Sequence, residues 1–197
     1  MSFLLGLTGS IGMGKSTTAR MFAEEGCDVW DADAAVHRLY REGGDAVSPM
    51  QAAFPGSVRD GAVDRAALRQ IIAADPGALK RIESIVHPLV ARDRARFRET
   101  ATSDILVFDI PLLFETGGDA AMDAVACVSV DPETQKARVL ARGTMTAEQF
   151  ELIRAKQMPD AEKRARSDYV ILTDSLEHAR DQVRVVLADI RKGRQHA

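Results

Sequence analysis

The stretch that decides the fold is Gly9-Ser10-Ile11-Gly12-Met13-Gly14-Lys15-Ser16. Its spacing is that of a phosphate-binding loop, in which a glycine, four further residues and a second glycine precede a lysine and a hydroxyl residue. The glycines let the backbone curl so that N–H groups face an anion. Lys15 supplies charge for the β- and γ-phosphates, and Ser16 offers a hydroxyl to Mg²⁺. The pattern predicts a site for a nucleoside triphosphate with Mg²⁺.

The residues on either side of this loop provide the context that the motif requires. The apolar run Phe3–Thr8 has the length of a strand, and Thr17–Glu25 has helical periodicity with Gly26 as its stop. Strand, loop and helix in this order favour a phosphate site over the alternative, an ordinary glycine-rich turn that carries a lysine by chance.

Strand-like segments recur along the chain and alternate with helices. The expected strands are Phe3–Thr8, Asp28–Trp30, Ile105–Ile110, Val125–Val130 and Tyr169–Thr173. Most are continuous apolar runs, as expected of parallel strands covered on both faces. We therefore expect an α/β fold with a five-stranded parallel sheet flanked by helices, whose ligands bind at the carboxyl ends of the strands.

Several helix N-termini carry recognisable signals. A capping aspartate before proline, or a capping box, occurs at Asp75-Pro76, Asp131-Pro132 and Thr146-Ala147-Glu148-Gln149. The last helix is expected after Ser175, with an apolar stripe of Leu176, Ala179, Val183, Val186, Leu187 and Ile190. We assign this stripe to core packing.

Length, composition and net charge indicate which class of protein the chain belongs to. The chain has 197 residues, of which 46% are hydrophobic, and this suits a single globular domain. The net charge of −3 gives no argument for nucleic acid as a partner, and no run approaches the roughly 18 apolar residues of a membrane span. Cys27 and Cys127 lie in apolar runs and are expected to be reduced core residues of a cytoplasmic protein.

Two helical segments interrupt the alternation of strands and helices. Residues 61–100 are expected to form a helical insertion, with breaks at Pro76 and at His87-Pro88. Residues 141–166 are polar, basic and helical, and are expected to form a lid. The remaining residues, 1–60, 101–140 and 167–197, would make up the core of the domain. The alternative is that both segments are helical padding on the sheet.

Asp31-Ala32-Asp33 follows the second expected strand. Phosphoryl transfer to a hydroxyl needs a carboxylate that orients the alcohol and accepts its proton, and Asp33 is the candidate. His37 is four residues further along and would share a helix face with Asp33. Asp33 could instead cap the helix over residues 34–41, or do both.

Two further carboxylates, Asp109 and Glu115, lie at and after the end of the third expected strand. Asp109 closes the apolar run and is similar to the aspartate that supports Mg²⁺ in phosphate-loop proteins, directly or through water. Pro111 ends the strand, and Glu115 is a candidate to face the site.

Basic residues gather in the lid segment. They are Arg138, Arg142, Arg154, Lys156, Lys163, Arg164 and Arg166. Arginines suit a transferring phosphoryl group, because their forked donors match phosphate geometry. Any single one of these side chains could equally belong to a solvated helix face.

The absence of asparagine excludes two classes of nucleotide-binding protein. Neither the guanine-reading motif of regulatory GTPases nor the catalytic loop of protein kinases can be present, since both need asparagine.

The ordered set of motifs resembles one family. The motifs are Leu7–Thr17, Asp31-Ala32-Asp33 with His37, His87-Pro88, Pro111–Glu115, Arg154 with Gln157, and Ser167–Ile171. Together they cover nearly the whole chain and are similar to dephospho-CoA kinases. The resemblance implies a P-loop kinase fold and transfer of the γ-phosphoryl of ATP to the ribose 3′-hydroxyl of dephospho-CoA, the last step of coenzyme A synthesis.

The resemblance also implies roles for individual residues. ATP would be held by Gly12, Met13, Gly14, Lys15, Ser16 and Thr17. Asp33, Lys15 and the lid residue Arg142 would be catalytic, and Asp31, His87 and Glu115 would bind the acceptor. Ser16 would bind Mg²⁺, with Asp109 supporting the ion through water. The partners would be ATP and dephospho-CoA, with no nucleic acid and no membrane, and the chain would be a monomer or a weak homo-oligomer.

Four positions depart from the family's common pattern. They are Ser10, Met13, Gly143 and the segment Leu172-Thr173-Asp174, where the family often has asparagine near adenine. Two alternatives remain open at this point: another small-molecule or nucleotide kinase, and a nucleotide-dependent switch that hydrolyses ATP without an acceptor.

Overall fold

The computed structural model describes residues 2–195, with side chains described to residue 194. The chain divides into two compact units. The first joins the N-terminal residues up to Trp30 with the residues from Thr102 onward, and the second is Asp31–Ala101. The second unit therefore begins well before the insertion expected at residues 61–100.

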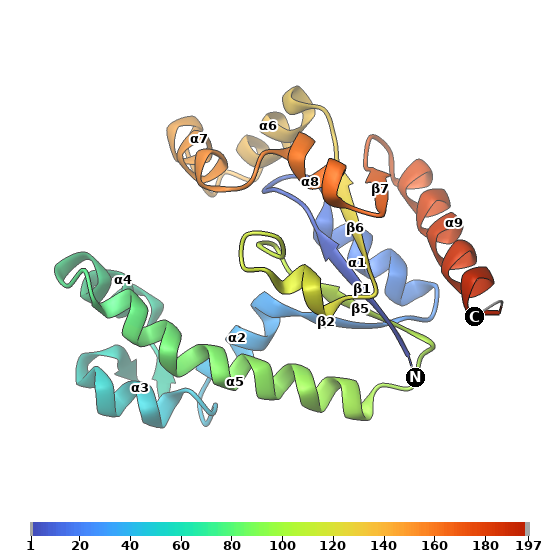
Figure 1. Ribbon diagram of the computed structural model, residues 1–197. Coiled ribbons are helices and arrows are strands. Elements are labelled where there is room, and N and C mark those ends of the chain that lie inside the picture. The colour runs from blue at the N-terminus through green and yellow to red at the C-terminus, as the bar shows by residue number, and fades with distance from the viewer. Residues whose placement is uncertain (1, 196–197) are drawn as a thin grey trace. The chain divides into compact units, whose positions relative to one another are not determined.

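The first unit is built on a five-stranded sheet. Its strands are β1 (Phe3–Thr8), β2 (Asp28–Asp31), β5 (Ile105–Asp109), β6 (Ala124–Ser129) and β7 (Tyr169–Leu172). Their order is β2-β5-β1-β6-β7 (Figure 1). β1 pairs in parallel with β5 and β6, and β6 pairs in parallel with β7. The expected fold and all five strands are confirmed, with ends that differ by at most one residue.

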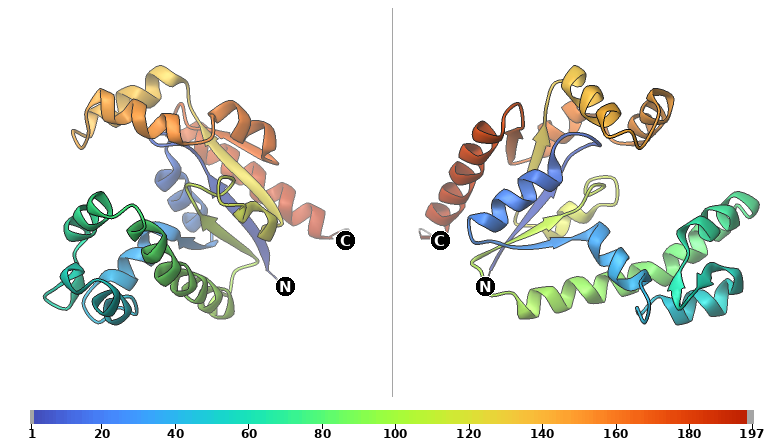
Figure 2. Two further views of the ribbon diagram at one scale, coloured as in Figure 1. Left: turned by 60° about the vertical axis from the view of Figure 1, so that its left-hand side comes forward. Right: turned by 180° about the vertical axis from the view of Figure 1, so that it is seen from behind.

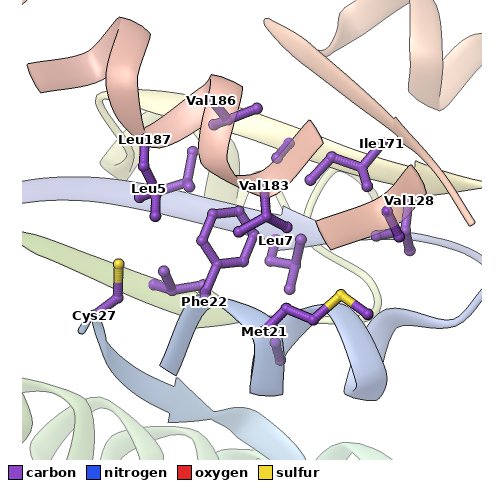
Figure 3. Close-up of a cluster of buried hydrophobic side chains, with 14 of the residues drawn as sticks. Leu5, Leu7, Met21, Phe22, Cys27, Val128, Ile171, Val183, Val186 and Leu187 are labelled. Carbon is purple, nitrogen blue, oxygen red and sulfur yellow. The ribbon is translucent and has the colours of Figure 1, made fainter. Parts of the chain in front are cut away.

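One face of this sheet is covered by α1 (Lys15–Glu24) and α9 (Leu176–Gln195). Figure 3 shows Phe22 of α1 and Val183 of α9 meeting Leu5 and Leu7 of β1. Phe22 has no exposed surface, and burial of such a side chain contributes about 3 kcal/mol. The predicted stripe of α9 is buried except for Leu176, which is 69% exposed. That leucine lies in the first turn, where it lines a pocket rather than the core.

The other face is covered by α8 (Asp160–Arg166) and by the segment that follows β5, including the short helix Gly118–Ala121. Leu113, Phe114 and Val125 form its core. The two remaining helices are α6 (Pro132–Ala141) and α7 (Ala147–Lys156), which lie side by side in Figure 2.

The second unit is mostly helical. It contains α2 (Ala32–Tyr40), α3 (Val47–Ala53), a 3-10 turn (Pro55–Ser57), β3 (Val58–Arg59), β4 (Ala62–Val63), α4 (Arg65–Ala74) and α5 (Ala78–Thr100). The two short strands form an antiparallel hairpin. Asp60 and Gly61 connect them with φ values of 48° and 73°, as a two-residue turn between strands requires.

Two expectations for this unit are wrong. The break at His87-Pro88 is absent, because α5 runs through Pro88. Ile82, Val86 and Leu89 are buried on one stripe of α5 on both sides of the proline, and this packing offsets the lost backbone hydrogen bond.

Asp75 does not cap a helix that starts at Pro76. α5 begins at Ala78 with Gly77 as its N-cap. Asp75 instead ends α4, where its carboxylate accepts the N–H of Gly77 and pairs with Arg81. The capping signals at Asp131 and Thr146 are confirmed.

The cysteines are core residues, as expected. Cys27 and Cys127 are both buried and free. Burial raises the pKa of Cys27 to about 11 and that of Cys127 to about 12, so both thiols are inert at neutral pH. Within residues 2–195, no helix is both long and apolar enough to cross a bilayer.

Candidate active site

The phosphate loop connects β1 to α1 and has no room for side chains at its tip. Gly12 has φ of 80°, and a Cβ there would lie 2.5 Å from Cγ2 of Val139 and 3.0 Å from the carbonyl oxygen of Gln135. Gly14, with φ of 92°, is the N-cap of α1, and no side-chain hydrogen bond to this cap occurs in the described chain. The N–H groups of Thr17 and Thr18 donate to the Gly14 carbonyl, and the positive end of the α1 dipole faces the loop, where it favours an anion.

Lys15 contacts the carboxylate of Asp109 at the carboxyl ends of two neighbouring strands, β1 and β5. Asp109 is 1% exposed and Lys15 is 15% exposed, so the ion pair is shielded from solvent. Lys15, which the motif assigns to the β- and γ-phosphates, is thus paired with Asp109 in this structure.

The oxygens near this pair fit a magnesium ion. Ser16 is exposed at the start of α1 and follows Lys15, whose ammonium contacts the Asp109 carboxylate. Hydroxyl and carboxylate oxygens are hard ligands of the kind that Mg²⁺ takes alongside substrate phosphates. No cluster of three or more histidine, cysteine, aspartate or glutamate side chains that could hold a metal ion occurs in the described residues.

A small pocket lies beside the loop, between α1, α6 and the start of α9. It has a volume of about 180 Å³. Its walls include Gly14, Thr17, Arg138, Arg142 and Thr173. Because one end of this pocket is the phosphate loop itself, its position suits the nucleoside part of the same nucleotide.

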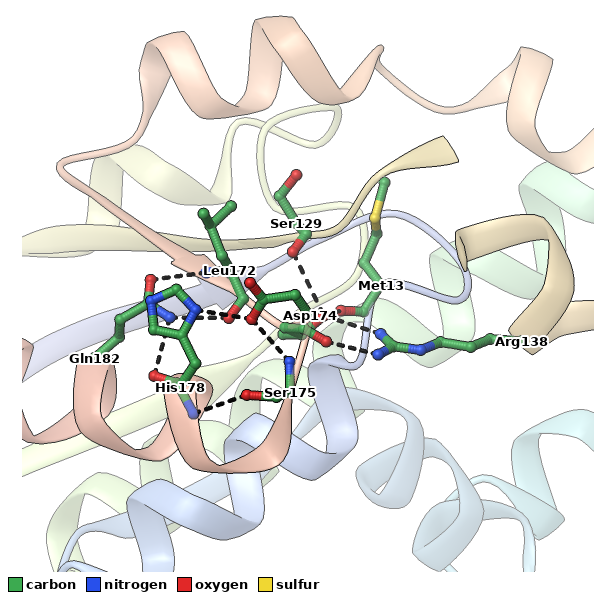
Figure 4. A network of polar contacts seen from close by, with 9 residues as sticks. Met13, Ser129, Arg138, Leu172, Asp174, Ser175, His178 and Gln182 are labelled. Carbon is green, nitrogen blue, oxygen red and sulfur yellow. Dashed lines mark hydrogen bonds and ion pairs between the residues drawn. The ribbon is translucent and has the colours of Figure 1, made fainter. Parts of the chain in front are cut away.

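Thr173 ties the pocket wall to the loop, because it bonds to both Met13 and Arg138; these two residues are labelled in Figure 4. Its hydroxyl donates to the carbonyl oxygen of Met13 at 2.7 Å and accepts from Arg138 at 3.0 Å. Arg138 also donates to the Thr173 carbonyl at 2.6 Å. The Met13 side chain is buried, and its sulfur accepts the N–H of Val130.

The expected lid segment is formed by α7, α8 and their connections. Most of its basic residues pair with acids: Arg154 with Glu151, Arg164 with Asp160, and Arg166 with Asp119. Arg142 ends α6 and is exposed at the wall of the small pocket.

Glu115 lies against this segment. Its carboxylate accepts from the buried Nζ of Lys163 at 2.9 Å and from the N–H of Met158 at 2.9 Å. Burial raises the pKa of Glu115, but the hydrogen bonds from Lys163 and Met158 outweigh it, and the net pKa is lowered. Glu115 therefore joins Met158, just after α7, to Lys163 in the middle of α8, a contact that the sequence does not predict.

Two aspartates at the start of α2 have different surroundings. Asp31 is the N-cap, and its carboxylate accepts the N–H of Ala34 at 2.9 Å. The alternative that Asp33 is the cap is therefore wrong, because α2 begins two residues earlier than expected. Asp33 and His37 are both exposed, one turn apart, so the Asp33 carboxylate is not committed to the helix end.

Asp33 lies on the wall of a pocket in the second unit. The pocket has a volume of about 490 Å³ and is lined by Asp33, Val36, Tyr40, Arg65, Leu68, Arg69 and Ile72. The Arg65 guanidinium lies 5.7 Å from the centre of the Tyr40 ring. A carboxylate, two arginines and an apolar floor can take an anionic ligand that also has apolar and hydroxyl parts.

Comparison with known proteins decides the family. The family model of dephospho-CoA kinases matches residues 3–178. The chain belongs to the dephospho-CoA kinase family. A dephospho-CoA kinase of Ruegeria pomeroyi is 73% identical over 197 residues, which is 100% of both chains. A crystal structure from Thermus thermophilus has a TM-score of 0.85 at 31% identity, covering 95% of this chain and 97% of that one.

A further solved structure supports the fold. A dephospho-CoA kinase from Campylobacter jejuni has a TM-score of 0.65 at 20% identity over 96% of this chain and 97% of that one. Members of the family are kinases that transfer phosphate to an alcohol, and the resemblance drawn from the motifs is confirmed.

The predicted site residues of this dephospho-CoA kinase family member fall into two groups. The first unit brings together Lys15, Ser16 and Asp109 around the loop, with Arg142 at the adjacent pocket. The second unit carries Asp31, Asp33 and His87. His87 is exposed in the middle of α5, where the sequence predicts a break.

Three polar residues that contact the loop were not assigned roles from the sequence. They are Thr173, Gln135 and Gln157, which bond to the loop backbone at Met13 and Ile11. Their positions in the chain carry no local signal, because each reaches the loop from an element far away in sequence. Of the three, Gln157 belongs to a motif of the family resemblance, the one that pairs it with Arg154.

Proposed function

We propose that this protein transfers the γ-phosphoryl group of ATP to the ribose 3′-hydroxyl of dephospho-CoA, giving CoA and ADP. The observation that carries the proposal is the phosphate loop with Lys15 against Asp109 at the carboxyl ends of β1 and β5. That arrangement grips a triphosphate, and membership of the family supports the choice of acceptor.

At the donor end, ATP is held by the loop residues Gly12, Met13, Gly14, Lys15, Ser16 and Thr17. Lys15 leaves Asp109 and pairs with the β- and γ-phosphates, since a lysine at this point of the motif is placed to follow the charge. Arg142, at the wall of the small pocket, neutralises charge on the transferring group. Ser16, with Asp109 through water, holds Mg²⁺, which when bound lowers the charge of the phosphate oxygens.

At the acceptor end, the pocket of the second unit binds dephospho-CoA. Arg65 and Arg69 suit the pyrophosphate of this acceptor, and the apolar wall suits its uncharged parts. Asp33 orients the 3′-hydroxyl and accepts its proton as the oxygen attacks the γ-phosphorus. The bond from that phosphorus to the β-phosphate oxygen breaks, and ADP leaves. Asp31, His87 and Glu115 are proposed as further acceptor contacts.

The surroundings of the enzyme are also part of the proposal. We propose a cytoplasmic enzyme that is a monomer or a weak homo-oligomer. Size-exclusion chromatography with light scattering, at two protein concentrations with and without ATP, tests the oligomeric state.

The decisive experiment measures ADP formation by the purified protein with Mg-ATP. We expect ADP to form only when dephospho-CoA is added, with CoA as the second product. A panel of other alcohols, including shikimate, adenosine and AMP, should give little turnover. ADP formation at the same rate without any acceptor would instead identify a hydrolytic switch and reject the proposal.

A further inference from the structure

Two glutamines hold the backbone of Ile11, in the phosphate loop, one at its N–H and the other at its carbonyl oxygen. Its N–H donates to Oε1 of Gln157 at 3.1 Å. Its carbonyl oxygen accepts from Nε2 of Gln135 at 2.7 Å. Gln135 is 3% exposed on α6, whereas Gln157 is the C-cap residue of α7. Two separate elements thus hold the two successive peptide planes that meet at Ile11.

Gln157 is itself held in place by the neighbouring residue. The N–H of Met158 donates to Glu115, and Glu115 pairs with buried Lys163. Lys163 therefore holds Glu115, and Glu115 holds the backbone of Met158. Because Met158 follows Gln157 directly, these contacts help to place the side-chain carbonyl of Gln157 against Ile11 of the loop.

Gln157 is half-buried and has open space on one side. It lines a cavity of about 570 Å³ together with Ser10, Met13 and Arg154. Its hydrogen bond to Ile11 holds the amide oxygen of this side chain against the loop.

The chemistry of the amide matters at this place. Backbone N–H groups of a phosphate loop converge on an anion, but the Ile11 N–H is taken by a neutral carbonyl. A glutamate could accept the same hydrogen bond, but would add a negative charge beside the triphosphate site. A glutamine holds the loop tip without repelling ATP.

We propose that Gln157 is a positioning residue, which holds the Ile11 N–H so that the remaining loop N–H groups converge on the γ-phosphate of ATP. It links the end of α7 to the geometry of phosphoryl transfer. The proposal rests on the proposed function for the identity of the nucleotide and the reaction.

The test uses three variants of the full chain. Gln157→Ala removes the acceptor, and Gln157→Glu keeps an acceptor of the same shape but adds a charge. The matched control is Gln149→Glu on the same helix, which adds the same charge and preserves the capping box, since glutamate serves as well there. For each variant we measure the melting temperature, kcat, KM for both substrates, and the Kd for ATP and for adenosine by calorimetry.

For Gln157→Ala we expect kcat to fall on the order of fivefold to tenfold, as for loss of one hydrogen bond, with KM for dephospho-CoA unchanged. For Gln157→Glu we expect a melting temperature near that of the wild type. Its Kd for ATP should rise at least about tenfold, as for a like charge close to phosphate, and its Kd for adenosine should not change. Gln149→Glu should match the wild type throughout.

Two results would overturn the proposal. The first is wild-type kcat in Gln157→Ala, and the second is equal affinity for ATP in Gln157→Glu and Gln149→Glu. If Gln157→Ala is unstable, the affinities of the glutamate variants still decide. Failure of the proposed function would look different, because the wild type would then bind ATP but show no acceptor-dependent ADP formation.

Discussion

The Nζ of Lys163 lies 2.9 Å from Oε1 of Glu115 and 3.1 Å from the carbonyl oxygen of Pro111, and the Lys163 side chain has no exposed surface. Lys163 comes from α8, whereas Glu115 and Pro111 belong to the segment after β5. Lys163 thus joins α8 to the segment after β5. We expect the ion pair between Lys163 and Glu115 to contribute to the free energy of unfolding.

We expect Glu115→Ala to lower the free energy of unfolding by about 3 kcal/mol, because it leaves the Lys163 ammonium buried without its counter-charge. Urea denaturation followed by circular dichroism measures the change. Lys136→Ala is the control, since its pair with Glu151 is longer, at 3.9 Å, and half-exposed. It should cost less than about 1 kcal/mol. Equal losses in the two variants would contradict the role given to the Lys163 pair.

The same pair gives a dependence on pH. The folded-state pKa of Glu115 lies below its ordinary value of 4.5. The stabilisation is therefore fully present above about pH 4.5 and is lost as pH falls through the folded pKa. We expect the stability difference between the wild type and Glu115→Gln to be constant near neutrality and to shrink on acidification. Urea midpoints at a series of pH values test this. A difference that grows toward acid would have the wrong sign.

Lys15→Ala should weaken both nucleotide binding and turnover. Loss of charge-assisted hydrogen bonds costs about 1.5–3 kcal/mol, so the Kd for ATP should rise roughly 10- to 100-fold. Calorimetric titration measures the affinity, and an ADP assay measures kcat. Binding of adenosine is the internal control and should be unchanged, because adenosine carries no phosphate.

Asp33→Asn should keep ATP binding and lower kcat by about 10²-fold or more, as for loss of a positioned base. The variant keeps the shape of the side chain, and Asp33 is not the helix cap, so α2 should remain folded. Asp45→Asn, another exposed aspartate of the second unit, is the control and should retain full activity. An Asp33→Asn enzyme with wild-type turnover would remove Asp33 from the mechanism.

Gly12→Ala and Gly143→Ala separate conformational strain from steric conflict. Both glycines have positive φ, 80° and 64°, and a side chain there costs about 1–2 kcal/mol. A Cβ at Gly12 would lie 2.5 Å from Cγ2 of Val139, whereas nothing lies within 4 Å of a Cβ at Gly143.

We therefore expect Gly12→Ala to abolish ATP binding by displacing the loop tip. Gly143→Ala should lose only stability and keep its affinity for ATP. Thermal unfolding and calorimetric titration of both variants provide the comparison. Tight ATP binding by Gly12→Ala would show that the loop tip can move away from α6.

The sequence predicts the sheet well, because most of its strands are short, continuous apolar runs. Local signals also predict the caps at Asp131 and Thr146. The errors occur where tertiary packing overrides a local signal. Pro88 does not break α5, because buried residues on both sides hold the helix together.

In the candidate site, too, the sequence predicts residues that carry a local signal and misses contacts that depend on tertiary packing. The loop motif identifies Lys15 and Ser16, and an aspartate at a strand end identifies Asp109. The contacts of Gln157 and Thr173 depend on which elements meet in space, and no spacing along the chain reveals them. The burial of Lys163 is hidden for the same reason, since in sequence it resembles its exposed basic neighbours.

The burial of Lys163 has a practical consequence. An amine with no exposed surface cannot react with an acylating reagent until α8 detaches from the segment after β5. Its labelling rate, followed by mass spectrometry, therefore reports the free energy of that local opening. Comparing the rate with and without ATP would show directly whether nucleotide binding tightens this side of the enzyme, without any mutation.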